Sequence, residues 1–267
     1  MPSRIRHGGP GLRATASLSV TASLCATSAL TIVLTAGCSA VSPSYASSGL
    51  ARQVSNGERI SAATRAHTAR QPAASHPQAA RQGAGAAATP APADVPRKIA
   101  GAQVTAIGDS VMAASAMALA KVLPGIYIDA VPSREMPAGL AVVRHLAVTG
   151  RLRQVVVMGL GTNYIVTNRQ LASLLRIIGP HRQLVLVNTY VPDEWSKEVN
   201  ATDASFVHSH PEVVLADWYD TIKNRMYLLW PDHVHPQMPG TTVYARLVNR
   251  AVQASRSATA IQPFNKA

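Results

Sequence analysis

The chain has 267 residues, enough for one substantial domain and a tail, and its formal net charge is +12. Before residue 99, ten Lys and Arg residues stand against two acidic ones, without the aromatic interleaving that is typical of base stacking. This distribution argues against nucleic acid as a partner and indicates attraction to a membrane surface or an anionic wall polymer. Both cysteines, Cys25 and Cys38, lie in the N-terminal apolar region, which excludes disulfides and cysteine metal clusters from the rest of the chain.

Residues 1–38 have the pattern of an export signal. Three arginines without an acidic residue precede an uncharged apolar run over residues 14–35. The run ends in Leu-Thr-Ala-Gly-Cys, which is similar to the lipobox of bacterial lipoproteins and predicts lipidation of Cys38. A cleaved signal without a lipid and an uncleaved membrane anchor are the alternatives, since the run is long enough to span a bilayer. We therefore expect an exported protein, on the outer side of the cytoplasmic membrane or in the cell envelope.

Residues 39–98 are rich in Ala, Ser, Pro, Gln and Gly, and their few larger apolar side chains show no sustained period. Such a composition cannot bury enough apolar surface to offset the entropy lost on ordering. We predict a disordered linker that tethers the working domain to the membrane.

Residues 99–256 alternate short apolar runs with amphipathic segments, and residues 257–267 are predicted to form a tail. Strands are expected at 104–108, 126–130, 155–159, 184–189 and 213–216. Helices are expected near 111–122, 135–149, 168–178, 195–209 and 240–255. Strands that are apolar almost throughout are buried on both faces. The alternation predicts an α/β, three-layer, doubly wound fold of the flavodoxin-like kind, with a five-stranded parallel sheet and a ligand site at the carboxyl ends of its strands.

Ser110 lies at the junction between the first predicted strand and the helix that follows it. The backbone N–H groups of a helix start point toward whatever a hydroxyl at this position attacks. Ser110 is therefore a candidate nucleophile. The alternative is that Ser110 only caps the helix, because serine is a favoured N-cap residue.

The segment Trp230-Pro231-Asp232-His233-Val234-His235-Pro236 precedes the last predicted helix. Asp232 and His235 are three residues apart, so the carboxylate can fix the imidazole tautomer and leave the other ring nitrogen facing Ser110. One alternative is a surface role for His235. Another is a metal site made by His233 and His235 beside Asp232, but no further ligand cluster accompanies them, and we expect neither a metal nor a cofactor.

A glycine-rich segment, Gly159-Leu160-Gly161-Thr162-Asn163, follows the third predicted strand. The amide of Asn163 can donate to an oxyanion, together with the backbone N–H of Ser110. The alternative is that Asn163 is a turn residue that tolerates left-handed backbone angles.

These blocks resemble the SGNH, or GDSL-type, hydrolase superfamily. The superfamily's first block matches Gly108-Asp109-Ser110-Val111, its third Gly161-Thr162-Asn163, and its fifth Asp232-His233-Val234-His235. The likeness is greater to the extracytoplasmic SGNH domain of peptidoglycan O-acetyltransferases, and it covers residues 104–252. It implies that Ser110 is the nucleophile, His235 the general base and Asp232 its orienting acid. By the same likeness, the Ser110 N–H and Asn163 stabilise the oxyanion.

Two positions depart from the pattern of that family. Ser133 stands where the second-block glycine is expected, and its N–H is a third oxyanion donor if its backbone adopts the same angles. His233 replaces a glycine that is common in the acetyltransferase-like sequences. Arg134 and Trp230 are candidates for substrate binding, the first through an anionic group and the second because it adjoins the acid–base loop. A solvated arginine and a core or rim tryptophan are the alternatives.

The resemblance implies an exported serine esterase or O-acetyltransferase that forms an acyl-enzyme on Ser110. Its expected substrate is cell-wall glycan or another O-acylated carbohydrate, with an acetyl-donating membrane protein as a separate partner in the transfer reaction. A catalytically silent, wall-binding lipoprotein of the same fold is the main alternative, favoured by the departures at Ser133 and His233. A generic lipase or thioesterase is the other, although nothing in the sequence resembles a lid.

Overall fold

The structure is a computed structural model that describes residues 48–70 and 98–260. The predicted export signal and the predicted lipidation of Cys38 lie outside the described residues. Within the described ranges, no helix is both long enough and apolar enough to cross a membrane.

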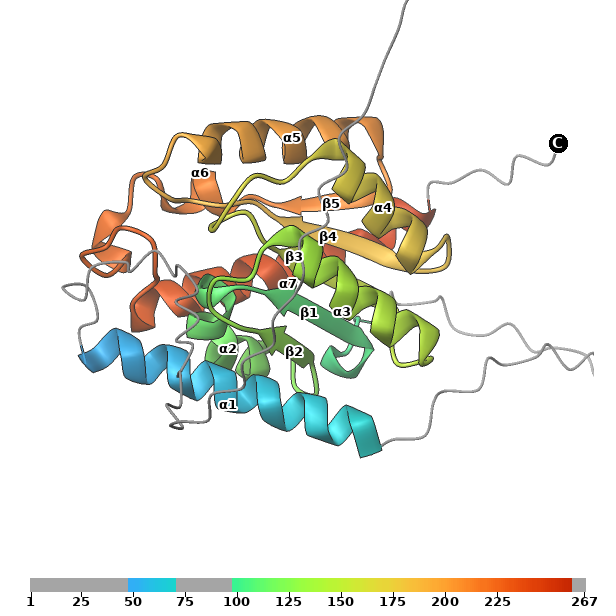
Figure 1. The fold of residues 1–267 in the computed structure, drawn as a ribbon, viewed down its shortest axis with the longest axis horizontal. Coiled ribbons are helices and arrows are strands. Elements are labelled where there is room, and N and C mark those ends of the chain that lie inside the picture. Colours follow the sequence, from blue (N-terminus) through green and yellow to red (C-terminus); the bar gives the residue numbers. More distant parts are fainter. Residues whose placement is uncertain (1–47, 71–97, 261–267) are drawn as a thin grey trace, which may run out of the picture. The chain divides into compact units, whose positions relative to one another are not determined.

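Five strands form one fully parallel sheet, and they follow the order β2-β1-β3-β4-β5 across it (Figure 1). Their bounds are β1 Val104–Gly108, β2 Tyr127–Ala130, β3 Val155–Gly159, β4 Gln183–Val187 and β5 Val213–Ala216. Gly108 at the end of β1 is in register with Ala130 of β2 and Gly159 of β3. The loops that follow these three strands therefore begin side by side at one edge of the sheet.

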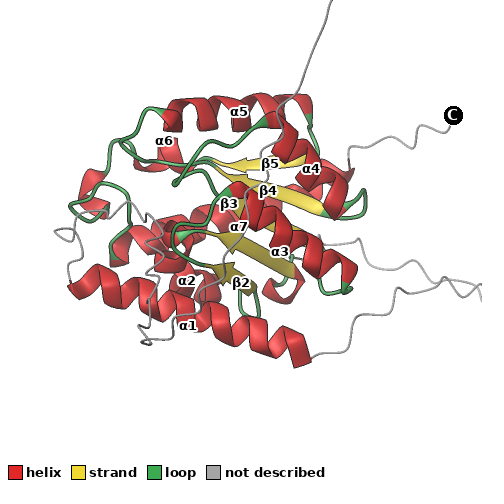
Figure 2. Ribbon diagram, viewed as in Figure 1, coloured by secondary structure: helices red, strands yellow, loops and turns green. Residues whose placement is uncertain are grey.

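Helices cover both faces of the sheet, as Figure 2 shows. One face packs on α2 (Ser110–Val122) and α7 (Met238–Ala260), and the other on α3 (Met136–Val148), α4 (Asn168–Ile178) and α5 (Trp195–Ser209). Each strand except β5 is buried along its whole length, because its Val, Ile and Leu side chains alternate between the two apolar layers. The predicted three-layer α/β fold with a five-stranded parallel sheet is confirmed.

Most element bounds differ from the predicted ones by only a few residues. Three short helices were not predicted: η2 (Gly101–Gln103), α6 (Trp218–Ile222) and η3 (Met226–Leu228). Helix α7 continues to Ala260, into the predicted tail over residues 257–267.

The prediction of a disordered linker over residues 39–98 is wrong for Ser48–Arg70, which form helix α1 and pack against α2 and β2. Apart from Leu50, the buried residues of this helix are small or polar, namely Gly57, Ser61 and Thr68. Such a face lacks the apolar period by which amphipathic helices are recognised. It is held by close backbone approach and hydrogen bonds, together with the packing of the partly buried Val54 and Ile60 against the core.

Candidate active site

The three residues predicted to carry the chemistry form one hydrogen-bonded line. The Oγ of Ser110 lies 2.8 Å from the Nε2 of His235, and the Nδ1 of His235 lies 2.8 Å from the Oδ2 of Asp232. These residues come from two loops far apart in the sequence that meet at the carboxyl edge of the sheet. The line has the geometry of a nucleophile, a general base and an orienting acid.

Asp232 is fixed by the backbone of its own loop. Its Oδ1 accepts the N–H groups of Val234 and His235 at 2.9 and 3.0 Å, which leaves Oδ2 for the imidazole. Burial acts to raise the pKa of Asp232, but the bonds from His235 and from the two backbone N–H groups outweigh it and hold the pKa below its usual value. The carboxylate is therefore ionised at neutral pH, as an orienting acid must be.

Residues 230–236, which we call the acid–base loop, are closed into a narrow hairpin. The N–H of Trp230 donates to the carbonyl of His235 at 2.8 Å, and the side chain of Gln237 donates to the carbonyl of Leu229 at 2.5 Å. His233 lies at the turn with a φ of 57°, in the left-handed region, and its side chain is exposed. The turn places Asp232 and His235 on the same side of the loop.

Ser110 is the first residue of α2, but it does not cap the helix. The N-cap is Asp109, whose Oδ1 accepts the N–H of Val111 at 2.9 Å. The hydroxyl of Ser110 is left to bind His235. The helix-cap interpretation of Ser110 is therefore wrong, and Asp109 provides the cap instead.

Asp109 is almost fully buried beside Ser110, with 1% of its surface exposed. Burial raises its pKa to about 6, although the N–H of Val111 and the nearby His235 oppose this shift. The folded state therefore holds a proton on Asp109 more tightly than the unfolded chain, whose carboxyl has its ordinary pKa near 3.8.

We expect Asp109→Asn to raise the free energy of unfolding at neutral pH. Between about pH 4 and pH 6 the unfolded chain loses this proton while the folded state keeps it, so the wild type loses stability as the pH rises, by about 3 kcal/mol in all. Asparagine keeps the cap and cannot ionise. Urea unfolding of both proteins should give a difference near zero at pH 4 that grows to pH 7. Asp203, whose pKa burial raises to about 8, is common to both proteins and cancels. A difference that does not change with pH would contradict this expectation.

Ser133, which stands where the second-block glycine was expected, adopts a left-handed backbone conformation. Its φ is 57°, and it lies in the loop after β2. The next residue, Arg134, accepts a hydrogen bond at its carbonyl from the side-chain amide of Asn163, at 3.3 Å. The loops after β2 and β3 thus meet, and in the sheet these two strands flank β1, which leads to Ser110. The amide of Asn163 has a second N–H that this contact does not use.

Since a left-handed residue with a side chain costs roughly 1–2 kcal/mol, Ser133→Gly and His233→Gly should each stabilise the fold. The gain is reduced by the greater freedom of glycine in the unfolded chain, and we expect up to about 1 kcal/mol in urea unfolding. Ser205→Gly is the matched control, because Ser205 is exposed in the middle of α5. There the same substitution should lower stability by about 0.5 kcal/mol. A loss of stability in both loop variants would show that the left-handed angles are not strained.

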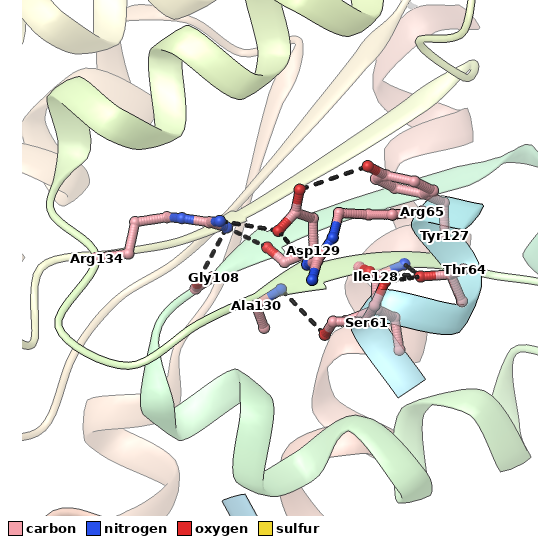
Figure 3. Close-up of polar contacts among 9 residues, drawn as sticks. All are labelled: Ser61, Thr64, Arg65, Gly108, Tyr127, Ile128, Asp129, Ala130 and Arg134. Carbon is pink, nitrogen blue, oxygen red and sulfur yellow. Dashed lines mark hydrogen bonds and ion pairs between the residues drawn. The ribbon is translucent and has the colours of Figure 1, made fainter. Parts of the chain in front are cut away.

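The guanidinium of Arg134 is bonded to protein groups, which argues against the predicted anion-binding role. Its guanidinium is buried and binds Asp129 of β2, through the carboxylate at 2.8 Å and through the backbone carbonyl (Figure 3). It also donates to the carbonyl of Gly108 at 3.3 Å, just before the nucleophile loop. The solvated-arginine alternative is wrong, since only 8% of this side chain is exposed.

Trp230 is partly buried, and its ring lies against Gly49 of α1. Its backbone closes the acid–base hairpin. A role in substrate binding stays a prediction, while its packing gives it a structural role behind the loop.

Two residues that contact the surroundings of the site were not predicted from the sequence. They are Asp129, which binds Arg134, and Gln53 of α1, which donates to the carbonyls of Ala114 and Pro236. Asp129 sits in an otherwise apolar strand, and a carboxylate placed there needs a cationic partner. The presence of Asp129 in this strand therefore indicated Arg134, five residues further along the chain, as its cationic partner. Gln53 had no comparable signal, because it lies in a segment without apolar periodicity.

No protein-family model matches the sequence. The chain is 31% identical over 152 residues to YrhL of Bacillus subtilis, a candidate peptidoglycan O-acetyltransferase by name. It is 32% identical over 146 residues to the peptidoglycan O-acetyltransferase OatA of Listeria monocytogenes. The matches cover 57% and 55% of this chain but 24% and 23% of those proteins, so the chain spans about a quarter of the length of these curated relatives.

Among solved structures, the C-terminal catalytic domain of OatA from Streptococcus pneumoniae, which carries a methylsulfonyl adduct, is similar to this chain with a TM-score of 0.54. The sequence identity is 22%, and the match covers 58% of this chain and 94% of that domain. This likeness supports the fold. With the sequence relatives, it confirms the predicted resemblance to the SGNH domain of peptidoglycan O-acetyltransferases.

Proposed function

We propose that this domain is a serine ester hydrolase or O-acetyltransferase that works through an acyl-enzyme on Ser110. The observation that carries the proposal is the line Ser110–His235–Asp232, in which both hydrogen bonds are 2.8 Å long. A serine hydroxyl at its ordinary pKa is a weak nucleophile, and a neutral imidazole in contact with it supplies the missing base.

In the first step, the Oγ of Ser110 bonds to the ester carbonyl carbon while its proton passes to the Nε2 of His235. The carbonyl electron pair moves onto oxygen, where the backbone N–H groups of Ser110 and Ser133 and the free amide N–H of Asn163 are the proposed donors. The imidazolium is stabilised by Asp232. As the tetrahedral intermediate collapses, the leaving alkoxide takes the proton from His235, and the acyl group stays on Ser110.

In the second step, a hydroxyl oxygen bonds to the acyl carbon while its proton passes to the Nε2 of His235. The bond between the acyl carbon and the Oγ of Ser110 then breaks, and Oγ takes the proton back from His235. If the hydroxyl belongs to water, the product is a free acid and the protein is an esterase. If it belongs to a sugar, the acyl group is transferred and the protein is an O-acetyltransferase. Both outcomes use the same nucleophile, base and orienting acid, and they differ only in the hydroxyl that accepts the acyl group.

The proposed substrate is the glycan of the cell wall. This rests on the names of the relatives, two of which refer to peptidoglycan O-acetylation, and on the basic leader and linker, whose charge favours an anionic envelope. Export, lipidation of Cys38 and a separate acetyl-donating membrane protein belong to the same proposal. Export and lipidation are proposed from the pattern of residues 1–38, and the partner protein is proposed as the source of the acetyl group in the transfer reaction.

The wall-binding, catalytically silent alternative depended on Ser133 and His233. Both residues adopt a left-handed conformation, so the side chain at neither position prevents the positive φ that glycine takes readily. This observation favours the enzyme over the silent protein.

The test is to incubate the purified full-length chain with 4-nitrophenyl acetate, with and without oligosaccharides of the wall glycan. Release of 4-nitrophenol together with acetylated sugar would support transfer, and release with free acetate alone would support hydrolysis. A fluorophosphonate probe should add its mass to the peptide that contains Ser110. Absence of both ester turnover and probe labelling would overturn the proposal.

A further inference from the structure

One face of helix α1 contacts three supports of the candidate active site. The contacting residues recur about every fourth position, so they lie along one side of the helix: Gly49, Gln53, Gly57, Ser61 and Arg65. In Figure 1, α1 passes along α2 and β2. From its N-terminal end, the face meets the acid–base loop, then the helix that carries Ser110, and then the strand that leads to Ser133.

Gln53 joins the first two of these supports. Its single amide nitrogen donates to the carbonyl of Pro236 at 2.7 Å and to the carbonyl of Ala114 at 3.2 Å. Pro236 directly follows His235, and Ala114 lies one helical turn after Ser110. One side chain thus binds the backbone on both sides of the contact between the base and the nucleophile.

Two glycines let α1 approach closely enough for this bridge. A Cβ on Gly57 would lie 1.7 Å from the carbonyl oxygen of Ala113, so the backbones of α1 and α2 touch there. A Cβ on Gly49 would lie 2.6 Å from the ring of Trp230, behind the acid–base loop. Gln53 sits between these two contacts, and its reach is therefore fixed by packing on either side.

Toward its C-terminal end, this face of α1 contacts β2, which is an edge strand of the sheet. The hydroxyl of Ser61 accepts the N–H of Ala130 at 3.2 Å, and the hydroxyl of Thr64 accepts the N–H of Ile128 and donates to its carbonyl (Figure 3). These side chains satisfy edge groups that no neighbouring strand pairs. Arg65 binds the carboxylate of Asp129 at 2.8 Å, opposite Arg134, whose carbonyl accepts from Asn163.

We propose that α1 positions the active site, with Gln53 as a positioning residue that sets the acid–base loop against the nucleophile helix. The proposal rests on the function proposed above. The Ser110–His235 bond joins two loops remote in sequence, and Gln53 ties the backbone of one to that of the other. A helix that precedes the first strand of the sheet therefore controls how often the base and the nucleophile are in contact.

The experiment compares the full-length wild type with Gln53→Glu and Gln53→Ala. Glutamate has the size of glutamine but cannot donate to two carbonyls. We expect both variants to lower kcat for 4-nitrophenyl acetate by about tenfold or more with little change in KM, because the base is misplaced and substrate contacts are kept. Hydrogen exchange of residues 230–237 should become faster in both variants, because the loop opens more often.

Arg59→Ala is the matched control, since Arg59 is exposed in the same helix and its loss should leave both measurements unchanged. Wild-type exchange in residues 230–237 with normal kcat in the Gln53 variants would overturn the proposal, even if their melting temperature fell. Faster exchange in a protein whose wild type shows no esterase activity would support the positioning role and reject the proposed function. The two ideas can therefore fail separately.

Discussion

Replacing Ser110 by alanine is expected to lower kcat for an acetyl ester by about 10⁴-fold or more, and to abolish labelling by a fluorophosphonate. The Oγ of Ser110 is the atom that would carry the acyl group, and it lies 2.8 Å from the Nε2 of His235. The fold should be unaffected, because Asp109 caps α2 and the N–H of residue 110 is kept. The KM for the ester should change little, since the hydroxyl makes its bond to the carbonyl carbon only during the reaction.

Ser115→Ala provides the matched control for this measurement. Ser115 is buried in the same helix, slightly more than one turn further on, and its hydroxyl donates to the carbonyl of Val111 at 3.0 Å. The substitution removes the same atom from a neighbouring position that does not contact His235, so turnover should stay close to that of the wild type. Equal loss in both variants would mean that the effect of Ser110→Ala arises from a disturbed helix rather than from a lost nucleophile.

The sheet and the hydrogen-bonded line Ser110–His235–Asp232 were predictable because each has a local pattern in the sequence. The five strands are apolar runs bounded by polar loops, and the order of strand and helix fixes which ends of the strands share an edge. Asp232 and His235 are close in sequence, so their pairing needs only one loop. The meeting of that loop with Ser110 followed from the parallel topology.

The contacts that were not predicted are made by segments without a recognisable pattern in the sequence. Helix α1 buries glycine, serine and threonine, and it is fixed by hydrogen bonds to backbone groups of β2 and α2. From composition alone such a segment is interpreted as a linker, because the sustained apolar period that marks a buried helix face is missing. The role of Arg134 was misjudged for a related reason, since its partner Asp129 is recognisable only once β2 is known to be buried.

Asp232→Asn is expected to lower kcat by about 10⁴-fold, through the tautomer of His235 rather than through a change of position. The Oδ1 of Asp232 accepts two backbone N–H groups, from Val234 and His235, which no amide nitrogen can replace. The asparagine oxygen must therefore take the Oδ1 position, and its NH₂ group must point at the Nδ1 of His235. An N–H aimed at Nδ1 forces the proton onto Nε2, which then donates to the Oγ of Ser110 and cannot accept its proton.

Steady-state turnover of the ester gives the magnitude, and ¹⁵N chemical shifts of the His235 ring give the tautomer. Asp220→Asn is the matched control, because it makes the same change in charge at an exposed carboxylate that pairs only with Lys223. We expect its turnover and its His235 spectrum to match those of the wild type. Wild-type turnover in Asp232→Asn with an Nε2-protonated ring would show that His235 does not act as the base, because such a ring has no lone pair facing Ser110. Loss of turnover with an unchanged tautomer would instead assign the effect of Asp232 to the stabilisation of the imidazolium.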